Sequence, residues 1–465
     1  MAGVARTFRP KGLAAQATHA FTRASGAFLR RYGKLGGALT LSLLVLAVGW
    51  ESVVGDARAD VLHGSPDTYR VLLRQLKPGD VLELGPGVYD GLPIHDLHGR
   101  ADAPITVAGH PDKTVIVANP SRNTVSVMNT SHVVIRDLRL DGRGIPTDGV
   151  VCERQSSWAH HVTIQNLTII NFGSGRFTVG IATRCPAWGW IIRGNRIVKP
   201  GTGMYLGNFD GTGPFFAATI EDNEILNPIG YGIQIKHQID RPQIEGMPSA
   251  KSVTVIRRNR IVKSEGASAG KDARPSLLVG HFPVAGAGSQ DSYLIYSNLF
   301  YDNPSEALFQ GEGNIALYNN LLVNPRGDAV HVQPHNDRPR AVFVFNNTVI
   351  AAGVGISVKG GKPGYEQRVD GNAVFASRPL AVGTAGRNFV ASPDRAPAHL
   401  VNPDGPLSAL DLKPRGDTLN AGDDVPTAMQ LFPEARADYL GVSRTAPVFG
   451  ACMNSIKGNA ANPCR

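Results

Sequence analysis

A short pattern of apolar and polar residues recurs nine times between residues 135 and 374, in forms such as IRGNRI, IEDNEI and LYNNLL. Its fourth position is Leu in the first two copies and Asn in the other seven, and successive copies are 22 to 39 residues apart. One copy is too short to bury its own apolar face, so the copies must stack on one another. The recurring positions are Leu138, Leu167, Asn195, Asn223, Asn259, Asn298, Asn320, Asn347 and Asn372.

A second strand pattern follows several copies about 9 to 14 residues later, as VGIATRC, TGMYLG, YGIQIKHQ, DAVHVQP and VGISVKGG. Both patterns alternate with period 2 and no regular helix separates them, which predicts an all-β fold, a parallel β-helix. Equivalent positions in successive coils would lie about 4.8 Å apart. We interpret the Asn column as stacked amides at a bend, which is a structural feature and not a site.

Residues 1–59 are predicted to be a signal peptide or an N-terminal anchor. Basic residues precede any acidic residue, Leu35–Trp50 is a charge-free apolar run of 16 residues, and Ala57-Arg58-Ala59 is a cleavage pattern. The run is short for a membrane span of about 20 residues, which favours a cleaved signal. Arg30-Arg31 leaves the choice between Sec and twin-arginine export open. We expect a periplasmic or secreted protein that meets the membrane only if this segment is uncleaved.

The formal net charge of +9 is concentrated in that segment, and only a weak excess of basic residues is left without it. Nucleic-acid binding usually needs a clustered basic face and aromatic platforms, and neither stands out. We therefore exclude nucleic acid as a partner and expect a monomer.

The chain has an even number of cysteines, which in an exported protein favours disulfides. Cys152 follows Leu138 by 14 residues and Cys185 follows Leu167 by 18, so the two cysteines should lie on adjacent coils. The distance between coils is compatible with a disulfide. No Cys/His motif has zinc-ligand spacing. We predict the pairs Cys152–Cys185 and Cys452–Cys464.

The segment LKPGDVLELGPGVYDG, followed by ADAPITVAGHPDKTVIV and the Asn coils, resembles exported right-handed parallel β-helix proteins of the pectate-lyase superfamily. It is most similar to the N-terminal part of chondroitinase B and alginate lyases, and the C-terminal run LDLKP to VFGA resembles the closing segment of such proteins. The resemblance covers about residues 60 to 451 and implies a right-handed β-helix. We expect the β-helix over residues 60–377, a short capping helix in TYRVLLRQL, and an irregular C-terminal segment, residues 378–465, that packs on it.

Candidate site residues come from the second strand of each coil, where apolar residues should point inward and their neighbours outward. His237, Glu312 and His335 should form a polar strip just past these strands, which the long coils would extend with His281. A row of outward side chains suits an extended polymer. The candidate substrate-binding residues are Arg184, Tyr205, Gln234, His281, Glu312, His331 and Lys359.

The resemblance implies β-elimination of an acidic, uronate-containing polysaccharide, in which a base removes the C5 proton and a cation meets the uronate carboxylate. In the chondroitinase B and alginate lyase family a Lys near this strand is the base, and Lys236 in IQIKHQ matches it. Gly280 and His281 stand where an Arg is expected. Acidic residues hold calcium in that family, but the paired-Glu calcium motif is not found here. The sequence therefore leaves open whether calcium is a cofactor. The candidate catalytic residues are Lys236, His237 and His335.

Two alternatives stay open. VHVQPHND, residues 330–337, resembles the D-P-H-D motif of alginate C5-epimerases and matches it at Pro334 and His335. An epimerase would need His331 or His335 as its base, because Gln333 cannot take a proton. The other alternative is a non-catalytic carbohydrate-binding or structural β-helix protein.

Overall fold

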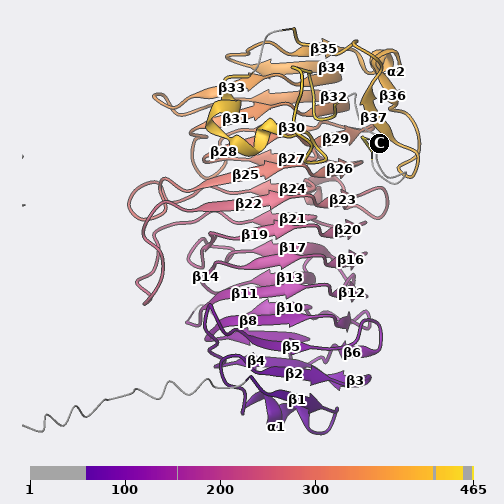
Figure 1. Cartoon of the computed structure of the whole chain (residues 1–465). Coiled ribbons are helices and arrows are strands. Elements are labelled where there is room, and N and C mark those ends of the chain that lie inside the picture. The colour runs from indigo at the N-terminus through magenta and orange to yellow at the C-terminus, as the bar shows by residue number, and fades with distance from the viewer. Residues whose placement is uncertain (1–58, 154–155, 423–425, 454–462, 465) are drawn as a thin grey trace, which may run out of the picture. The chain divides into compact units, whose positions relative to one another are not determined.

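The computed structural model describes residues 59–153, 156–422, 426–453 and 463–464. These residues form short parallel strands stacked coil on coil, and the chain climbs from the bottom to the top of Figure 1. No helix within these ranges is long and apolar enough to span a membrane. The predicted leader or anchor lies, apart from Ala59, outside the described residues. The all-β parallel β-helix predicted from the repeats is confirmed.

One strand of every coil belongs to a 14-stranded sheet, which we call sheet A. Its main path is β1 (Val61–Gly64), β2 (Val81–Leu84), β5 (Ile105–Ala108), β8 (Thr130–Arg136), β11 (Ala159–Gln165), β15 (Ile191–Arg193), β19 (Thr219–Glu221), β22 (Val253–Arg257), β25 (Ser292–Tyr296), β28 (Ile315–Tyr318), β31 (Val342–Phe345) and β33 (Gln367–Asp370). β14 (Ala187–Trp188) pairs with β11 and with β18 (Phe215–Phe216).

A second, 21-stranded sheet contains two parallel ladders. The first ladder is β3 (Gly87–Asp90), β6 (Thr114–Val117), β9 (Arg139–Asp141), β12 (Thr168–Ile170), β16 (Arg196–Val198), β20 (Glu224–Leu226), β23 (Arg260–Val262), β26 (Leu299–Tyr301), β29 (Leu321–Asn324), β32 (Thr348–Val358), β34 (Ala373–Val382) and β35 (Phe389–Ala391). Strand stacking thus continues past the predicted boundary at residue 377.

The second ladder carries the second strand pattern of the repeats. It is β4 (Leu92–His95), β7 (Val125–Met128), β10 (Val150–Cys152), β13 (Val179–Thr183), β17 (Thr202–Leu206), β21 (Ile233–Ile235), β24 (Leu277–Val279), β27 (Phe309–Gly311) and β30 (Val330–Val332), continued by the second halves of β32 and β34.

Alternation with period 2 builds the core. In β22, Thr254 and Ile256 are buried while Val255 and Arg257 are partly exposed, because successive side chains of a strand point to opposite faces. Pairing in register then stacks one buried aliphatic residue per coil through sheet A from β2 to β33. That column is Leu82, Val107, Ile135, Ile164, Ile192, Ile220, Ile256, Ile295, Leu317, Val344 and Val369.

The Asn column is a continuous ladder of buried amides at the bend between sheet A and the first ladder. The Asn259 side-chain nitrogen donates to Asn298 Oδ1 at 3.0 Å and to the Ile220 carbonyl oxygen at 2.8 Å. The Asn259 backbone N–H donates to the same Asn298 oxygen at 2.9 Å. The pattern repeats from Asn195 to Asn372 and ends on Asn388. Each amide satisfies backbone groups that the bend would leave unpaired, which explains its recurrence.

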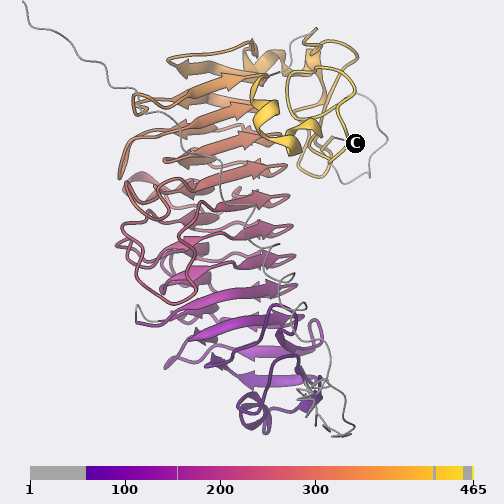
Figure 2. The same ribbon diagram turned by 60° about the vertical axis from the view of Figure 1, so that its left-hand side comes forward.

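A helix covers the N-terminal end of the stack, and the C-terminal segment packs along the upper coils. Helix α1 (Tyr69–Leu73) buries Tyr69 and Leu73 in the core beside β1, as the predicted capping helix should. The C-terminal segment contains η2 (Pro393–Arg395), α2 (Ala396–His399), β36 (Leu400–Asn402), β37 (Asp411–Pro414), α3 (Ala428–Leu431) and η3 (Pro433–Arg436), and it lies against the upper coils in Figure 2.

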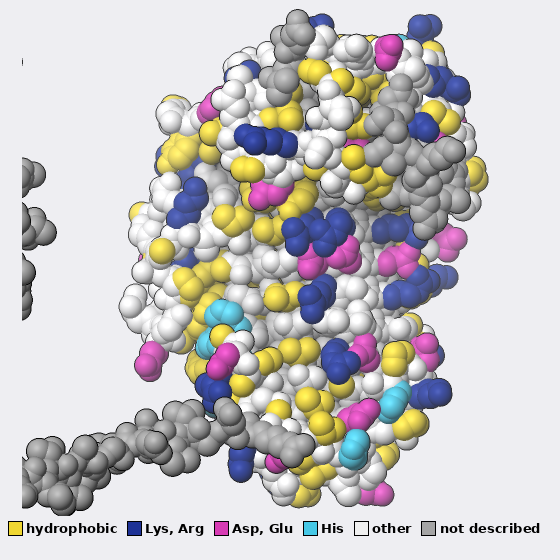
Figure 3. Space-filling view, in the orientation of Figure 1, with side chains coloured by type: hydrophobic (Ala, Val, Ile, Leu, Met, Phe, Trp, Pro, Cys, Tyr) yellow, Lys and Arg dark blue, Asp and Glu magenta, His cyan; other side chains and the backbone are white. Residues whose placement is uncertain are grey.

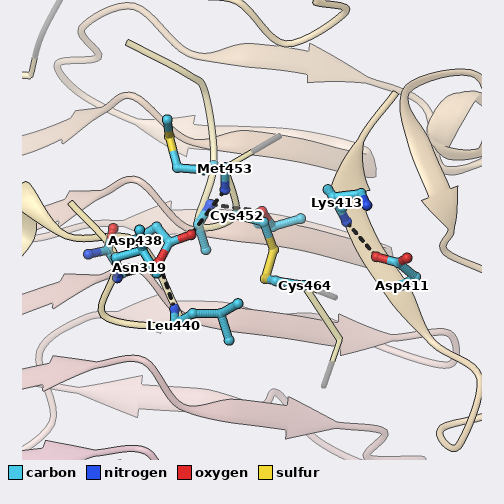
Figure 4. The surroundings of a disulfide bond; sticks show 12 residues. Asn319, Asp411, Lys413, Asp438, Leu440, Cys452, Met453 and Cys464 are labelled. Carbon is cyan, nitrogen blue, oxygen red and sulfur yellow. Dashed lines mark hydrogen bonds between the residues drawn. A yellow bond between two sulfur atoms is a disulfide. The ribbon is translucent and has the colours of Figure 1, made fainter. Parts of the chain in front are cut away.

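The C-terminal segment is fastened to the coils by hydrogen bonds and by aromatic packing. Asn319 donates to the Ala437 carbonyl at 2.7 Å and accepts from Arg444 at 2.8 Å. The disulfide Cys452–Cys464 closes the segment beside them (Figure 4). The second predicted disulfide, Cys152–Cys185, joins adjacent coils with a Cα separation of 5.7 Å, so both pairings are confirmed.

Candidate functional site on the second ladder

The outer face of the second ladder presents two columns of side chains. The first is Ala182, Tyr205, Gln234, Leu278, Gln310, His331 and Ser357. The second lies two residues further along each coil, where backbone bonds continue the stacking past the strand ends. It is Arg184, Gly207, Lys236, Gly280, Glu312, Gln333 and Lys359. Unlike the Asn column, neither column repeats its residue type from coil to coil.

Lys236 stands between two glycines in the second column. A Cβ atom at Gly207 would lie 3.2 Å from Lys236 Cβ, and one at Gly280 would lie 2.7 Å from the Lys236 carbonyl carbon. The glycines therefore let the neighbouring coils approach, and they leave the Lys236 side chain without a column neighbour on either side.

The half-buried Lys236 ammonium group has no ion-pair partner among the described residues, where only the more distant charges of Glu312 and Asp210 act on it. Burial lowers the pKa of Lys236 from its ordinary value of 10.5, and the two carboxylates oppose that shift in part. A desolvated, unpaired lysine is more readily deprotonated, which is the property a general base requires.

Charged groups from three loops surround Lys236. His237 is half-buried, and burial lowers its pKa, with the charges of Lys236 and His335 acting in the same direction. Glu312 and Asp210 act on His237 in the opposite direction. His237 Nδ1 has no hydrogen-bond partner among the described residues. The structure thus brings the predicted catalytic residues Lys236, His237 and His335 into one cluster.

Glu312 has a different role from the predicted one. Its side chain is only 3% exposed. One carboxylate oxygen accepts the His281 N–H at 3.2 Å, and the other accepts the N–H groups of His335, Asn336 and Asp337 at 3.1, 2.8 and 3.1 Å. Four backbone donors occupy the carboxylate, so Glu312 anchors the 335–337 turn and is not free to contact a substrate.

Four other predicted substrate-binding residues lie outside this cluster or are enclosed by the protein. His281 is buried, with Nδ1 on the Phe282 carbonyl and Nε2 3.2 Å from the Arg338 carbonyl. Gln234 is also buried. His331 Nε2 lies 2.9 Å from the Asp328 carboxylate, and Lys359 is exposed four coils beyond Lys236. His281 and Gln234 are thus enclosed by the protein, His331 is held by Asp328, and Lys359 lies away from the Lys236 cluster.

Arg184 and Tyr205, in contrast, line a cavity of about 450 Å³ over β13 and β17. Its floor contains the small residue Ala182, whose side chain leaves room beside Tyr205. Burial, together with Tyr231, raises the pKa of Tyr205 to about 12. A second concavity of about 740 Å³ towards the N-terminus shares Arg184 and Phe177 with the first, so the two adjoin along the ladder.

Aromatic side chains wall this cavity. Phe177 and Phe209 are 77% and 69% exposed, which is unusual for large apolar residues. The loop that carries Phe209 is held by Asn208, whose amide donates to Asp210 at 2.9 Å and to Thr212 at 3.1 Å. Exposed rings on an ordered loop are suited to stacking against the apolar faces of sugar rings.

Arginines surround the same cavity, but their charges are not equally available. Arg184 is paired with the buried Asp148, and Arg176 lies 2.8 Å from Asp272. Arg274 bonds only to backbone carbonyls and packs over the Tyr231 ring at 5.7 Å. Within the described residues no carboxylate lies within ion-pair distance of Arg274, so its guanidinium is the better partner for an incoming anion.

Charges on sheet A compensate one another instead. Arg257 and Arg258 lie 2.7 and 2.8 Å from Glu221, and Figure 3 shows basic side chains beside acidic ones over the middle coils. An anionic polymer would find less uncompensated positive charge there than at Lys236 and Arg274.

Four residues of this cavity were not predicted from the sequence: Phe177, Phe209, Tyr231 and Arg274. Arg274 lies in the loop SEGASAGKDARP, in which no pattern singled out one residue. Phe177 and Phe209 are large apolar residues in Gly-containing loops outside the repeat. A large apolar residue in such a loop was the feature of the sequence that could have indicated a binding surface.

The cluster does not fit a calcium site. Glu312 is already occupied by four N–H groups, and the described residues place no cluster of three acidic side chains within ligand distance of one another. Calcium needs six to eight oxygen ligands, which these residues do not supply.

Comparisons with known proteins agree on the fold. The family model for a right-handed β-helix region matches residues 179–374, so the chain is a right-handed parallel β-helix, as the resemblance implied. No curated protein matches the chain.

Solved structures that are similar to this chain include an alginate lyase from Paenibacillus sp., at 17% identity over 71% of this chain and 97% of that one, with a TM-score of 0.40. A lacto-N-biosidase from Eubacterium ramulus is 12% identical over 71% of this chain and 68% of its own, with a TM-score of 0.43. The A-module of a mannuronan C-5 epimerase from Azotobacter vinelandii is 13% identical over 70% and 92%, with a TM-score of 0.39.

Proposed function

We propose that this chain is an exported enzyme that binds an acidic, uronate-containing polysaccharide along the second ladder and cleaves it by β-elimination. The observation that carries the proposal is the half-buried Lys236, which has no ion-pair partner among the described residues, on the coil next to that of Tyr205. Tyr205 lines the aromatic-walled cavity that Arg274 borders. Two disulfides are consistent with an oxidising compartment.

Binding would use the walls of the cavity. Phe177 and Phe209 would stack on successive sugar rings, and Arg274 would hold a uronate carboxylate through paired N–H donors. Neutralising that carboxylate makes the proton on C5 more acidic, because the carbanion that forms delocalises onto the carboxylate oxygens.

The elimination itself needs one base and one acid. Neutral Lys236 would take the C5 proton, the electrons of the broken C–H bond would form the C4–C5 double bond, and the bond from C4 to the leaving oxygen would break. Tyr205, protonated because burial raises its pKa to about 12, would donate its proton to the leaving oxygen. Proton transfer from the Lys236 ammonium to the tyrosinate, directly or through water, would restore both groups.

The first test is incubation of the purified chain with alginate, polygalacturonate and chondroitin sulfate, with and without calcium. The ultraviolet absorbance of the unsaturated uronate product is recorded. A rise on one polymer supports elimination and names the substrate, and a flat trace on all three contradicts it. Deuterium incorporation at C5 from heavy water without unsaturated product would instead indicate an epimerase. Retention on a polymer column with neither reaction would indicate a binding protein.

A further inference from the structure

Three histidines gather on two neighbouring strands of sheet A, away from the second ladder. One ring nitrogen of each of His132, His160 and His161 lies within 4.8 Å of the other two. His132 belongs to β8, and the other two belong to β11 of the next coil. Figure 3 shows histidine side chains at the molecular surface at the height of β11. Neither the proposed function nor the repeat accounts for this group.

The rings are held by packing. His160 is stacked between Trp158, at 5.2 Å, and Trp188, at 4.7 Å. His161 stacks on His132 at 4.6 Å. A Cβ atom at Gly189 would lie 3.0 Å from His161 Nε2, so the glycine of the next coil makes room for this ring. Such packing reduces the conformational freedom that ligand binding would otherwise have to remove.

The spacing of the nitrogens suits a transition metal. His160 Nδ1 and His161 Nδ1 are 2.7 Å apart, at hydrogen-bond distance from each other. Zinc bound by histidine at about 2.0–2.1 Å in a tetrahedral site keeps its ligand nitrogens roughly 3.3 Å apart. Small side-chain rotations would bring the three nitrogens, now within 4.8 Å of one another, to that spacing.

We propose that His132, His160 and His161 form a binding site for a divalent transition metal of the zinc class. Imidazole nitrogen favours zinc, nickel, cobalt and copper over calcium and magnesium, which prefer oxygen. His161 is exposed, so a fourth position remains open to water or to another ligand.

The metal would join two coils. His132 lies on the coil of β8 and Cys152, and His160 and His161 lie on the coil of β11 and Cys185. The disulfide between these cysteines links the same two coils, so the metal would be a second cross-link between them. A ligand that binds only the folded state raises its stability, which gives a readout independent of any activity on polysaccharide.

The test is calorimetric titration of Zn²⁺ into the full chain, freed of metal by a chelator and carrying no polyhistidine tag. We expect one equivalent to bind and the melting temperature to rise with Zn²⁺ but not with Ca²⁺. His132→Asn and His161→Asn should each weaken binding at least about tenfold. Asn is chosen because both positions have a φ of 52°, which Asn tolerates well.

His335→Asn, which changes a histidine in the turn after β30, is the matched control and should bind Zn²⁺ like the unchanged protein. Melting curves without metal show whether the two variants still fold, and Co²⁺ absorbance in the visible range reports tetrahedral coordination by a second method. Absence of stoichiometric Zn²⁺ binding to the unchanged chain would overturn the proposal. Equal affinity in a folded His161→Asn variant would overturn it too.

Discussion

The Asn column and the outer face of the second ladder belong to the same coils, but the residue type repeats from coil to coil only in the Asn column. In the Asn column, seven repeats place the same residue at the same bend, and each amide makes equivalent hydrogen bonds. In the second column on that outer face, the residue type changes from coil to coil: Gly207, Lys236, Gly280 and Glu312 follow one another. Repetition therefore marks the parts that hold the coils together, and its loss marks the surface on which we propose that a substrate binds.

The largest expected effect concerns Lys236. We expect Lys236→Met to lower the rate of unsaturated product formation by about 100-fold or more, because the base is lost while the aliphatic stem is kept. The thermal melting curve should change little. Lys359→Met, in the same column but exposed and four coils away, should keep its rate. A Lys236→Met variant with more than half the original rate would exclude Lys236 as the base.

A change in the Asn column should act on stability and not on chemistry. Asn259→Ala removes donors to Asn298 and Ile220 and leaves buried groups unpaired, so we expect the free energy of unfolding to fall by about 2–4 kcal/mol. Denaturant titration measures this loss. Asn388→Ala, at the partly exposed end of the column, should cost about half as much. Equal costs at both positions would show that burial does not determine the contribution of the amide.

Substitutions of Arg274 test whether the cavity binds the carboxylate of the polymer. Arg274→Ala should weaken retention on the substrate polymer about tenfold, since the carboxylate loses a charged partner that no other group replaces. Arg274→Lys should recover part of the affinity, and the recovered part should fall with added salt. Arg193→Ala, on the exposed face of sheet A, is the control. A similar loss of affinity for Arg193→Ala would indicate binding by overall charge and not by the cavity.

The smallest expected effect is a shift of the pH profile. Elimination needs neutral Lys236, so the rate should rise with pH through the pKa of Lys236, which burial places below 10.5. The Asp210 carboxylate raises that pKa, and Asp210→Asn should therefore move the rising limb to lower pH, by about half a unit or less. Asn keeps an oxygen that can accept the Thr212 N–H. A shift to higher pH would contradict the proposed role of Lys236.

The sequence was sufficient for the fold because the fold repeats. The spacing of Asn195 to Asn372 predicted coils, the alternating strands predicted the core, and Cys152 and Cys185 were assigned to adjacent coils by counting from the column. Such inferences need only the distance along the chain and the period of a strand.

The site was only partly predictable, because its contacts come from loops that follow no period. Counting along the coils brought Lys236, His237 and His335 together, but it could not reveal that Glu312 faces four backbone N–H groups. It also could not show that Arg184 is already paired while Arg274 has no carboxylate partner among the described residues. Both facts depend on where a loop turns back, which the repeat does not encode.

Hydrogen exchange is the most direct test of the claim that the non-repeating face of the second ladder binds the substrate. Exchange would be measured on Lys236→Met with and without saturating oligosaccharides prepared from alginate, polygalacturonate or chondroitin sulfate. We expect slower exchange of backbone amide hydrogens in the loops at 171–178, 207–213 and 264–276 when oligosaccharide is bound. Exchange in the bend that carries the Asn column should not change. Protection confined to sheet A or to the C-terminal segment, or no protection with any of the three, would contradict it.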